Sequence, residues 1–250
     1  MKLNLNKSDI DYQKMNTKFK DDGYIVIRNL IDSKTVIEIK KELSKYLKRN
    51  RNKFSKRNIN FVGDNINSIH NISNWQITKQ LQRNTNFSKL ISSLLGNNYK
   101  TFGSEIFAKP AKKGLRVPLH QDNFYWCLDP PLALTVWIAL DKSNKKNGSI
   151  KYYKNSHNLG VFQHECSNMP GSSQKLKHIE GLNVFKLSQP DLLPGDCLIH
   201  HCNIIHESEE NTSNEPRVGW TLRFRGKQTK IDNVRKKEYE KSLFKQIKKR

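Results

Sequence analysis

The chain has 250 residues, of which 35% are hydrophobic, and carries a formal net charge of +22 at pH 7. A single hydrophobic core can still grow at this length, so we expect one domain over residues 1–250. The apolar residues gather in periodic runs such as residues 132–140, which excludes a disordered chain.

The excess of 45 Lys and Arg over 23 Asp and Glu would attract polyanions if it lay on one face. The lysines are spread along the whole chain, so the pattern favours a solvated basic surface, and we expect no nucleic-acid partner. The basic segment 48–57 is interpreted in the same way, with steering of an anionic substrate as the alternative.

Four cysteines, Cys127, Cys166, Cys197 and Cys202, form no CxxC pair and show no zinc or secreted-disulfide spacing. We therefore expect free thiols in a reducing compartment. Residues 1–20 are polar, and no apolar stretch approaches the roughly 18 residues that a membrane span needs. The sequence predicts a cytoplasmic protein without a membrane span, and it carries no signal for an oligomeric state.

The first half of the chain predicts a strand followed by helices, a unit over about residues 20–98. Residues 23–28 form a β-branched strand after a turn, and Asp32 or Ser33 can cap an amphipathic helix that follows. Residues 48–75 lack periodicity and predict a loop, and residues 87–95 predict a short helix that ends at Gly96.

From about residue 99 to 226 the pattern changes to short strands separated by turns, which predicts a jelly-roll core. A basic amphipathic helix is expected over about residues 232–250. The fold class is therefore mainly β with flanking helices. The predicted core strands are 101–109, 132–140, 149–153, 182–187, 196–200 and 217–225.

His120 and Asp122 are two residues apart, so on a strand their side chains would point to one face and could hold one ion. His206 follows a turn at Pro194-Gly195 and supplies a third ligand. Two histidines and one carboxylate leave adjacent coordination positions open, as a non-haem Fe(II) centre requires, although zinc in the same ligands would suit hydrolysis.

Other histidines compete with this assignment. His200 and His201 could be ligands, but they end an apolar run, and we favour His206 over both. His157 lies in a turn and is expected to be a hydrogen-bonded structural histidine. His70, His164 and His178 lie in loop-like segments without sequence partners.

Arg217 lies eleven residues beyond His206 and opens the run Arg217-Val-Gly-Trp-Thr-Leu-Arg-Phe-Arg. Alternation places Arg217, Gly219 and Thr221 on one face, so an inward guanidinium beside small residues makes a carboxylate pocket. Ser208 could add a hydroxyl donor. Arg223 and Arg225 share this face and are the competing candidates.

These residues resemble the signature of the phytanoyl-CoA dioxygenase family, which has HxD, a distal His and an Arg eleven residues later. The likeness extends to the segments 120–126, 135–141, 147–149, 155–157 and 202–206, and covers roughly residues 20–226. It implies a cupin-like double-stranded β-helix, that is, a jelly roll. It further implies Fe(II) at His120, Asp122 and His206, with O2 and 2-oxoglutarate as cosubstrates.

The same likeness places Trp137 and Glu105 near 2-oxoglutarate and joins Ser208 to Arg217 on it. A carboxylate at Glu105 would repel the cosubstrate unless it is paired, and Lys109 is a candidate partner. Because related halogenases replace the metal-binding carboxylate by a small residue, Asp122 favours hydroxylation of a small or medium organic substrate, with release of succinate and CO2.

Two alternatives remain open at this point. One is a non-catalytic jelly-roll binding module that retains the ligands, and the other is a nucleic-acid demethylase that uses the same chemistry. Residues 124–126 could line the substrate entrance or simply pack. The expected substrate loops, 48–75 and 160–180, contain no readable motif, so the substrate itself is not predicted.

Overall fold

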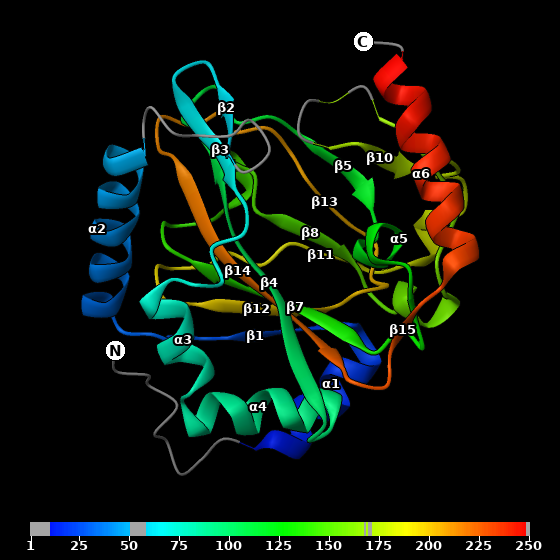
Figure 1. Ribbon diagram of the computed structural model, residues 1–250, viewed down its shortest axis with the longest axis horizontal. Coiled ribbons are helices and arrows are strands. Elements are labelled where there is room, and N and C mark those ends of the chain that lie inside the picture. Colours follow the sequence, from blue (N-terminus) through cyan, green and yellow to red (C-terminus); the bar gives the residue numbers. More distant parts are fainter. Residues whose placement is uncertain (1–10, 51–58, 168, 170–171, 249–250) are drawn as a thin grey trace.

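A seven-stranded antiparallel sheet runs through the centre of the molecule, in a computed structural model that describes residues 11–50, 59–167, 169 and 172–248 (Figure 1). Its strand order is β1-β12-β7-β14-β4-β3-β2. The strands are β1 Tyr24–Ile27, β12 Cys197–His201, β7 Ala133–Ala139, β14 Arg217–Gly226, β4 Tyr99–Lys109, β3 Asn65–Ile69 and β2 Ile59–Val62.

A second, four-stranded sheet has the order β11-β8-β13-β5. Its strands are β11 Leu187–Ser188, β8 Ile150–Tyr153, β13 His206–Ser208 and β5 Val117–His120. The two sheets face each other, because Tyr24, Trp137 and Leu198 of the large sheet pack in one cluster with Ile150 and Tyr152 of the small one. This sandwich is the predicted jelly roll.

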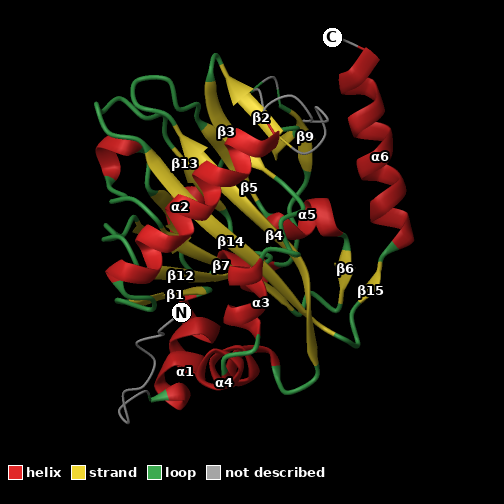
Figure 2. Ribbon diagram, turned by 60° about the vertical axis from the view of Figure 1, so that its left-hand side comes forward, coloured by secondary structure: helices red, strands yellow, loops and turns green. Residues whose placement is uncertain are grey.

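The outer face of the large sheet is covered by four helices (Figure 2). They are α1 Tyr12–Asp22, α2 Ser33–Asn50, α3 Gln76–Gln82 and α4 Thr85–Leu95. Strict alternation along β14 explains the packing, because Trp220, Leu222 and Phe224 turn outward into the helix-side core while their neighbours turn inward. The helices therefore bury one face of the sheet and leave the other to the site.

Two helices lie at the open end of the sandwich. The short helix α5 (Asp122–Trp126) follows β5 directly, and α6 (Asn233–Lys248) packs against it through Tyr239, whose ring lies 6.0 Å from Phe124 and 5.8 Å from Tyr125. Figure 1 shows α6 running along this end.

Two short antiparallel ribbons complete the strands. One pairs β6 (Leu128–Asp129) with β15 (Lys230–Ile231), and the other pairs β9 (His164–Cys166) with β10 (Gln174–Leu176). The 3-10 turns are Lys145–Asn147, Ser156–Leu159 and Leu182–Val184.

Several predicted elements are confirmed. The strand predicted at 23–28 is β1, and Asp32 caps α2 by accepting a hydrogen bond from the backbone N–H of Thr35 at 2.7 Å. The helix predicted at 87–95 is α4, which begins two residues earlier and ends at Gly96. Helix α6 lies where the basic terminal helix was expected.

Other predictions are wrong in physical detail. The described part of 48–75 contains the hairpin β2–β3, which extends the large sheet, whereas residues 51–58 of the basic segment lie outside the described residues. Of the strand predicted at 182–187, residues 182–184 form a 3-10 turn and only Leu187 lies in a strand, β11. The sequence pattern predicted no pairing partner for the strand at 23–28, and the structure pairs β1 with β12 in the large sheet.

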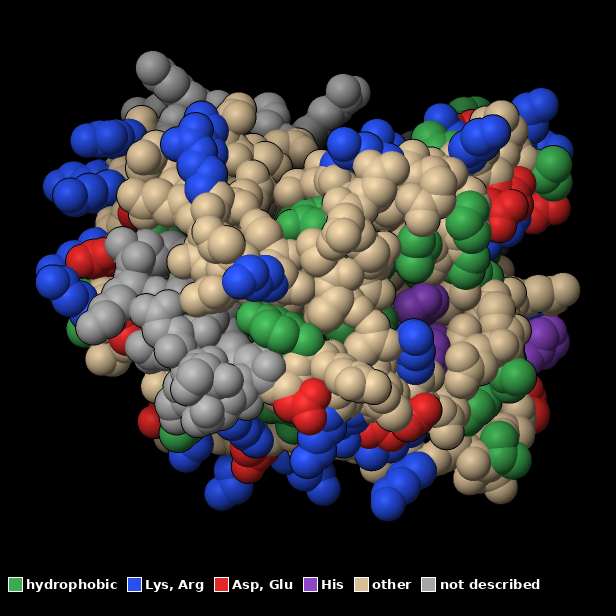
Figure 3. Space-filling model, turned by 90° about the horizontal axis from the view of Figure 1, so that it is seen from below, with side chains coloured by type: hydrophobic (Ala, Val, Ile, Leu, Met, Phe, Trp, Pro, Cys, Tyr) green, Lys and Arg blue, Asp and Glu red, His purple; other side chains and the backbone are tan. Residues whose placement is uncertain are grey.

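Basic side chains do not form one continuous patch on the face drawn in Figure 3, where they are interspersed with acidic side chains. Within the described residues, none of the helices combines the length and apolar character needed to cross a membrane. The mixed charges on the face drawn in Figure 3 add no support to the demethylase alternative, which the net charge had suggested.

Candidate active site

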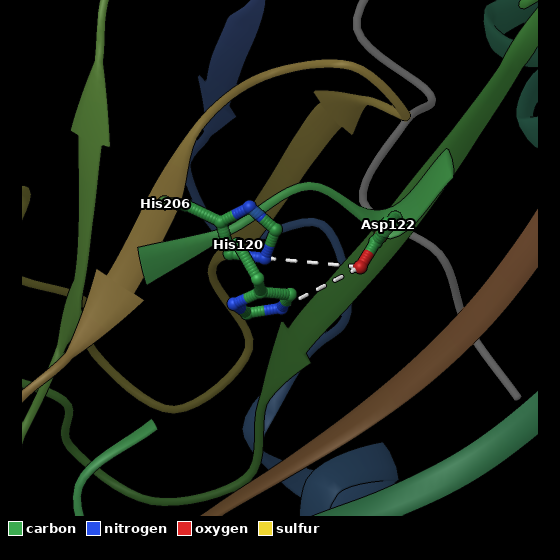
Figure 4. Close-up of side chains that lie close together, drawn as sticks. All are labelled: His120, Asp122 and His206. Carbon is green, nitrogen blue, oxygen red and sulfur yellow. Dashed lines mark ion pairs between the residues drawn. The ribbon is translucent and has the colours of Figure 1, made fainter. Parts of the chain in front are cut away.

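Three candidate metal ligands converge between the two sheets, at the end next to α5. His120 ends β5 and lies in register with His206, which begins β13. The nearest ligand atoms of His120, Asp122 and His206 all lie within 4.8 Å of one another. In Figure 4 both imidazole rings face the carboxylate, and each Nε2 atom is 3.8 Å from Oδ1 of Asp122.

Asp122 does not lie on the strand that the HxD spacing suggested. The strand ends at His120, and Asp122 opens helix α5. The intervening Gln121 is fully buried and fixes this turn, because its amide donates to the carbonyls of Gly160 and Asn203 and accepts from the N–H of Phe162. The carboxylate reaches the imidazole by this turn and not by alternation along a strand.

Both histidines are held in the tautomer that a metal requires. The Nδ1 atom of His120 lies 2.8 Å from the carbonyl of Pro118, and that of His206 lies 3.0 Å from the carbonyl of Ile204. A carbonyl only accepts, so each Nδ1 carries the proton and each Nε2 lone pair is free for an ion. Burial lowers the pKa of both imidazoles, which keeps them neutral.

Asp122 is held by two donors on its second oxygen. Thr135 donates its hydroxyl to Oδ2 at 2.7 Å, and Nε2 of His200 lies 3.2 Å from the same atom. Burial alone would raise the pKa of Asp122, but the hydrogen bond from His200 and the neighbouring His206 lower it below its usual value. The carboxylate therefore stays ionised and presents Oδ1 to the histidines.

The competing histidines lie outside the three-ligand group. His200 stands behind Asp122, and its Nδ1 is 2.9 Å from the hydroxyl of Tyr152. His201 accepts a hydrogen bond at Nδ1 from the N–H of Asn203. The structural role predicted for His157 is confirmed, because its Nε2 lies 2.9 Å from the carbonyl of Lys20.

Arg217 is a buried cation without an acidic partner in the described part of the chain. Its Nη1 donates to the carbonyl of Gly148 at 2.6 Å, and its Nε has no hydrogen-bond partner. The guanidinium carbon lies 5.2 Å from the centre of the Trp137 ring. Burial lowers the pKa of Arg217 to about 10, so the group remains charged near neutral pH, with no carboxylate of the described residues to balance it.

Trp137 and Ser208 line the same cavity as Arg217. Gly219 explains how the indole fits, because a Cβ atom at that position would lie 2.1 Å from the Trp137 ring. Ser208 lies two residues beyond His206 on β13, on the same face. The predicted alternation of Arg217, Gly219 and Thr221 toward one face is thus confirmed.

Glu105 has different partners from the one expected. Its Oε1 accepts from Nη2 of Arg223 at 2.9 Å and lies 2.8 Å from Nδ1 of His70. The amine of Lys109 instead donates to the carbonyls of Leu115, Ser208 and Glu209, at 2.5, 3.2 and 2.5 Å. Lys109 therefore ties β4 to the end of β13 and leaves Glu105 to Arg223.

These groups line one cavity of about 680 Å³ that contains the three candidate ligands. Arg223 lines it, whereas Arg225 does not. Sequence reasoning missed His70, whose partner Glu105 is distant in the sequence, and it set His200 aside only as a ligand. Neither role has a local sequence signal, because each depends on pairing between distant strands. The wall of the cavity also includes Thr135, Trp126, Tyr125 and Leu243.

Comparison with known proteins agrees with this geometry. The model of the family described as Phytanoyl-CoA dioxygenase (PhyH) matches residues 19–219. A relative from Oryza sativa subsp. japonica, named Phytanoyl-CoA dioxygenase 1, is 30% identical over 177 residues, which are 66% of this chain and 56% of the relative. The chain spans about half the length of the first curated relatives it matches.

Solved structures share the fold. The epimerase SnoN in complex with Fe3+, alpha ketoglutarate and nogalamycin RO superposes with a TM-score of 0.70 at 20% identity, over 88% of this chain and 85% of SnoN. EctD from S. alaskensis with bound Fe superposes with a TM-score of 0.72 at 20% identity, over 90% and 80% of the two chains. From the family match over most of its length, we conclude that the chain belongs to the phytanoyl-CoA dioxygenase family.

Proposed function

We propose that this protein is an Fe(II)- and 2-oxoglutarate-dependent dioxygenase that hydroxylates a small or medium organic molecule. One observation carries the proposal: the three ligand atoms within 4.8 Å of one another share a cavity with Arg217, a buried guanidinium with no acidic partner among the residues that the structure describes. A metal and a dicarboxylate would satisfy both groups at once.

The donor set fits iron. Two neutral imidazoles and one carboxylate would leave adjacent coordination positions open, as a non-haem Fe(II) site requires. Bound iron would supply the redox chemistry that couples O2 to decarboxylation of 2-oxoglutarate, with succinate and CO2 as products. His120, Asp122 and His206 would hold it, and His200 and Thr135 would keep the carboxylate in place.

The protein itself would mainly bind and orient. Arg217 would pair with the far carboxylate of 2-oxoglutarate, helped by the hydroxyl of Ser208, and the ring of Trp137 would form the wall beside it. Trp137 and Ile150, one from each sheet, line the cavity with buried Arg217 and would limit access of water there. Hydroxylation is preferred over halogenation because Asp122 occupies the ligand position that a halide would need.

Metal-dependent binding of 2-oxoglutarate tests the proposal. Under anaerobic conditions, calorimetry should show 2-oxoglutarate binding to the Fe(II)-loaded protein at one site, and binding at least tenfold weaker to the metal-free protein. His206→Ala should lose this metal dependence. Equal binding with and without Fe(II) would contradict the chelate that the site is proposed to form.

A further inference from the structure

A polar network runs along the cavity wall that the metal ligands do not occupy. It begins on the hairpin β2–β3, where Nε2 of His70 lies 3.0 Å from the hydroxyl of Ser68 and 3.3 Å from the amide of Asn60. It continues through Nδ1 of His70 to Glu105 and from there to Arg223. All five side chains line the cavity.

Arg223 has the same unusual surroundings as Arg217, the proposed cosubstrate residue. Each guanidinium lies against an aromatic ring, that of Arg223 at 5.4 Å from Phe102 and 5.7 Å from Trp126. Among the described residues, each guanidinium donates to one acceptor, and each has a buried Nε without a hydrogen-bond partner. Donors left unsatisfied in a buried place are costly, and where such an arginine also lines a cavity a ligand can complete its hydrogen bonds.

The two arginines differ in their charge balance. Arg217 has no acidic partner among the described residues, whereas Arg223 is paired with Glu105. Only Oε1 of Glu105 is used, and neither its Oε2 nor Nη1 of Arg223 makes a hydrogen bond within the described part of the chain. The cavity wall thus offers a ligand one acceptor, Oε2 of Glu105, and one donor, Nη1 of Arg223. The charges of these two side chains cancel.

By strand register, this pair lies toward the candidate ligand Asp122 and away from Arg217, the proposed carboxylate residue. Arg223 is the register partner of Thr135, whose hydroxyl holds Asp122. Glu105 lies four residues along β4 from Lys109, the register partner of Arg217, which is roughly 13 Å of strand. A group bound to the pair would therefore belong to the primary substrate, close to the metal.

We propose that Glu105 and Arg223 bind a neutral hydroxyl or carboxamide group of the primary substrate, which donates to Glu105 and accepts from Arg223. This inference rests on the proposed function. A carboxylate at this place would be repelled by the carboxylate of Glu105, and an ammonium group would be repelled by the guanidinium of Arg223. Only a neutral group that both donates and accepts satisfies the pair without repulsion.

Four probes on one carbon skeleton test the proposal: benzamide, benzyl alcohol, benzoate and benzylamine. The aromatic ring suits the Tyr125 and Trp126 side of the cavity. Dissociation constants are measured by ligand-observed NMR on anaerobic Fe(II)-loaded protein saturated with 2-oxoglutarate, so that the proposed Arg217 pocket is already filled. Benzamide and benzyl alcohol should bind about tenfold more tightly than benzoate and benzylamine.

Charge-removing variants give the decisive readout. Glu105→Gln leaves the positive charge of Arg223 without its carboxylate partner, so the affinity for benzoate should rise about tenfold. Arg223→Gln should instead raise the affinity for benzylamine. Arg225→Gln is the matched control, because Arg225 lies on the same strand against Phe102 at 5.6 Å and also has a buried Nε without a partner, yet does not line the cavity. It should leave the ranking and the basal activity unchanged.

The outcomes separate this inference from the proposed function. If 2-oxoglutarate fails to bind in a metal-dependent way, the proposed function itself fails. If it binds, but benzoate or benzylamine ranks first or no probe binds, only the assignment of Glu105 and Arg223 is wrong. An unchanged ranking in both Glu105→Gln and Arg223→Gln would overturn it equally.

Discussion

His200 lies directly behind the candidate metal ligand Asp122, with its Nε2 3.2 Å from the carboxylate Oδ2. Tyr152 lies 2.9 Å from Nδ1 of the same ring, so a hydroxyl proton given to Nδ1 leaves Nε2–H to point at the carboxylate. All three residues come from different elements, β12, α5 and β8. The arrangement fixes which oxygen of Asp122 faces the histidines.

Replacement of His200 should therefore weaken metal binding without removing a ligand. We expect His200→Ala to raise the Fe(II) dissociation constant by roughly 10- to 100-fold, the range typical of residues that hold a metal ligand, and Tyr152→Phe to raise it less. Anaerobic competition with a coloured chelator measures this dissociation constant. His201→Gln is the control on the same strand. Equal losses of Fe(II) affinity in the two histidine variants would refute the role of His200 in holding Asp122.

Loss of Arg217 should act on the cosubstrate. Arg217→Ala removes the buried cation beside Trp137 and should raise the KM for 2-oxoglutarate by about a hundredfold, as loss of one member of a buried charged pair typically does. The Fe(II) affinity should stay within about twofold. Steady-state succinate formation at varied 2-oxoglutarate gives the result, and an unchanged KM would show that the carboxylate binds elsewhere.

Helix α6 should support the metal site through α5. Tyr239 packs edge-on against both Phe124 and Tyr125, which follow Asp122 on α5, and each such aromatic contact contributes about 0.5–1.5 kcal/mol. Tyr239→Ala should thus lower the free energy of unfolding and raise the Fe(II) dissociation constant several-fold. Val234→Ala, at an exposed position of the same helix, should change neither. Equal unfolding free energies and equal Fe(II) dissociation constants in the two variants would contradict a role of α6 in holding the metal site.

The metal-free protein should lose stability in mild acid. Burial lowers the pKa of His164 to about 4 and that of His201 to about 3, and both rings accept a backbone N–H that protonation would displace. Between the unfolded value of about 6.5 and these folded values, the unfolded chain binds more protons, so stability falls as pH falls. Each histidine contributes at most about 1.4 kcal/mol per pH unit in this window.

Urea unfolding of chelator-treated protein measures the free energy of unfolding at about pH 7 and about pH 5. His201→Gln should reduce the difference between the two values. His178 is exposed, so His178→Gln should leave the difference as it is. A native protein equally stable at both pH values would contradict the burial of these rings.

Much of this fold follows from patterns within single segments. Alternation along Arg217–Gly226 predicts both the outward Trp220 and the inward Arg217, because a strand in a sandwich must bury each face differently. The capping aspartate before α2 and the glycine after α4 fix helix ends locally. These elements needed no knowledge of distant partners.

What could not be predicted depends on distant pairing. The hairpin β2–β3 has weak alternation and is stabilised by its place at the edge of the large sheet, next to β4. Asp122 was expected on a strand, but buried Gln121 bonds to the carbonyls of Gly160 and Asn203 and turns the chain into α5. The partner expected for Glu105 was likewise wrong. Lys109 has a basic side chain, but its amine donates to the carbonyls of Leu115, Ser208 and Glu209 instead.

Turnover at the His120, Asp122 and His206 site is tested most directly by succinate release. We would purify the protein, load it with Fe(II) anaerobically, add 2-oxoglutarate, admit air and measure succinate, with His206→Ala beside it and no primary substrate added. We expect slow succinate release by the wild-type protein and none by the variant. Equal succinate from both proteins, or none from a native protein that binds Fe(II) and 2-oxoglutarate together, would contradict it.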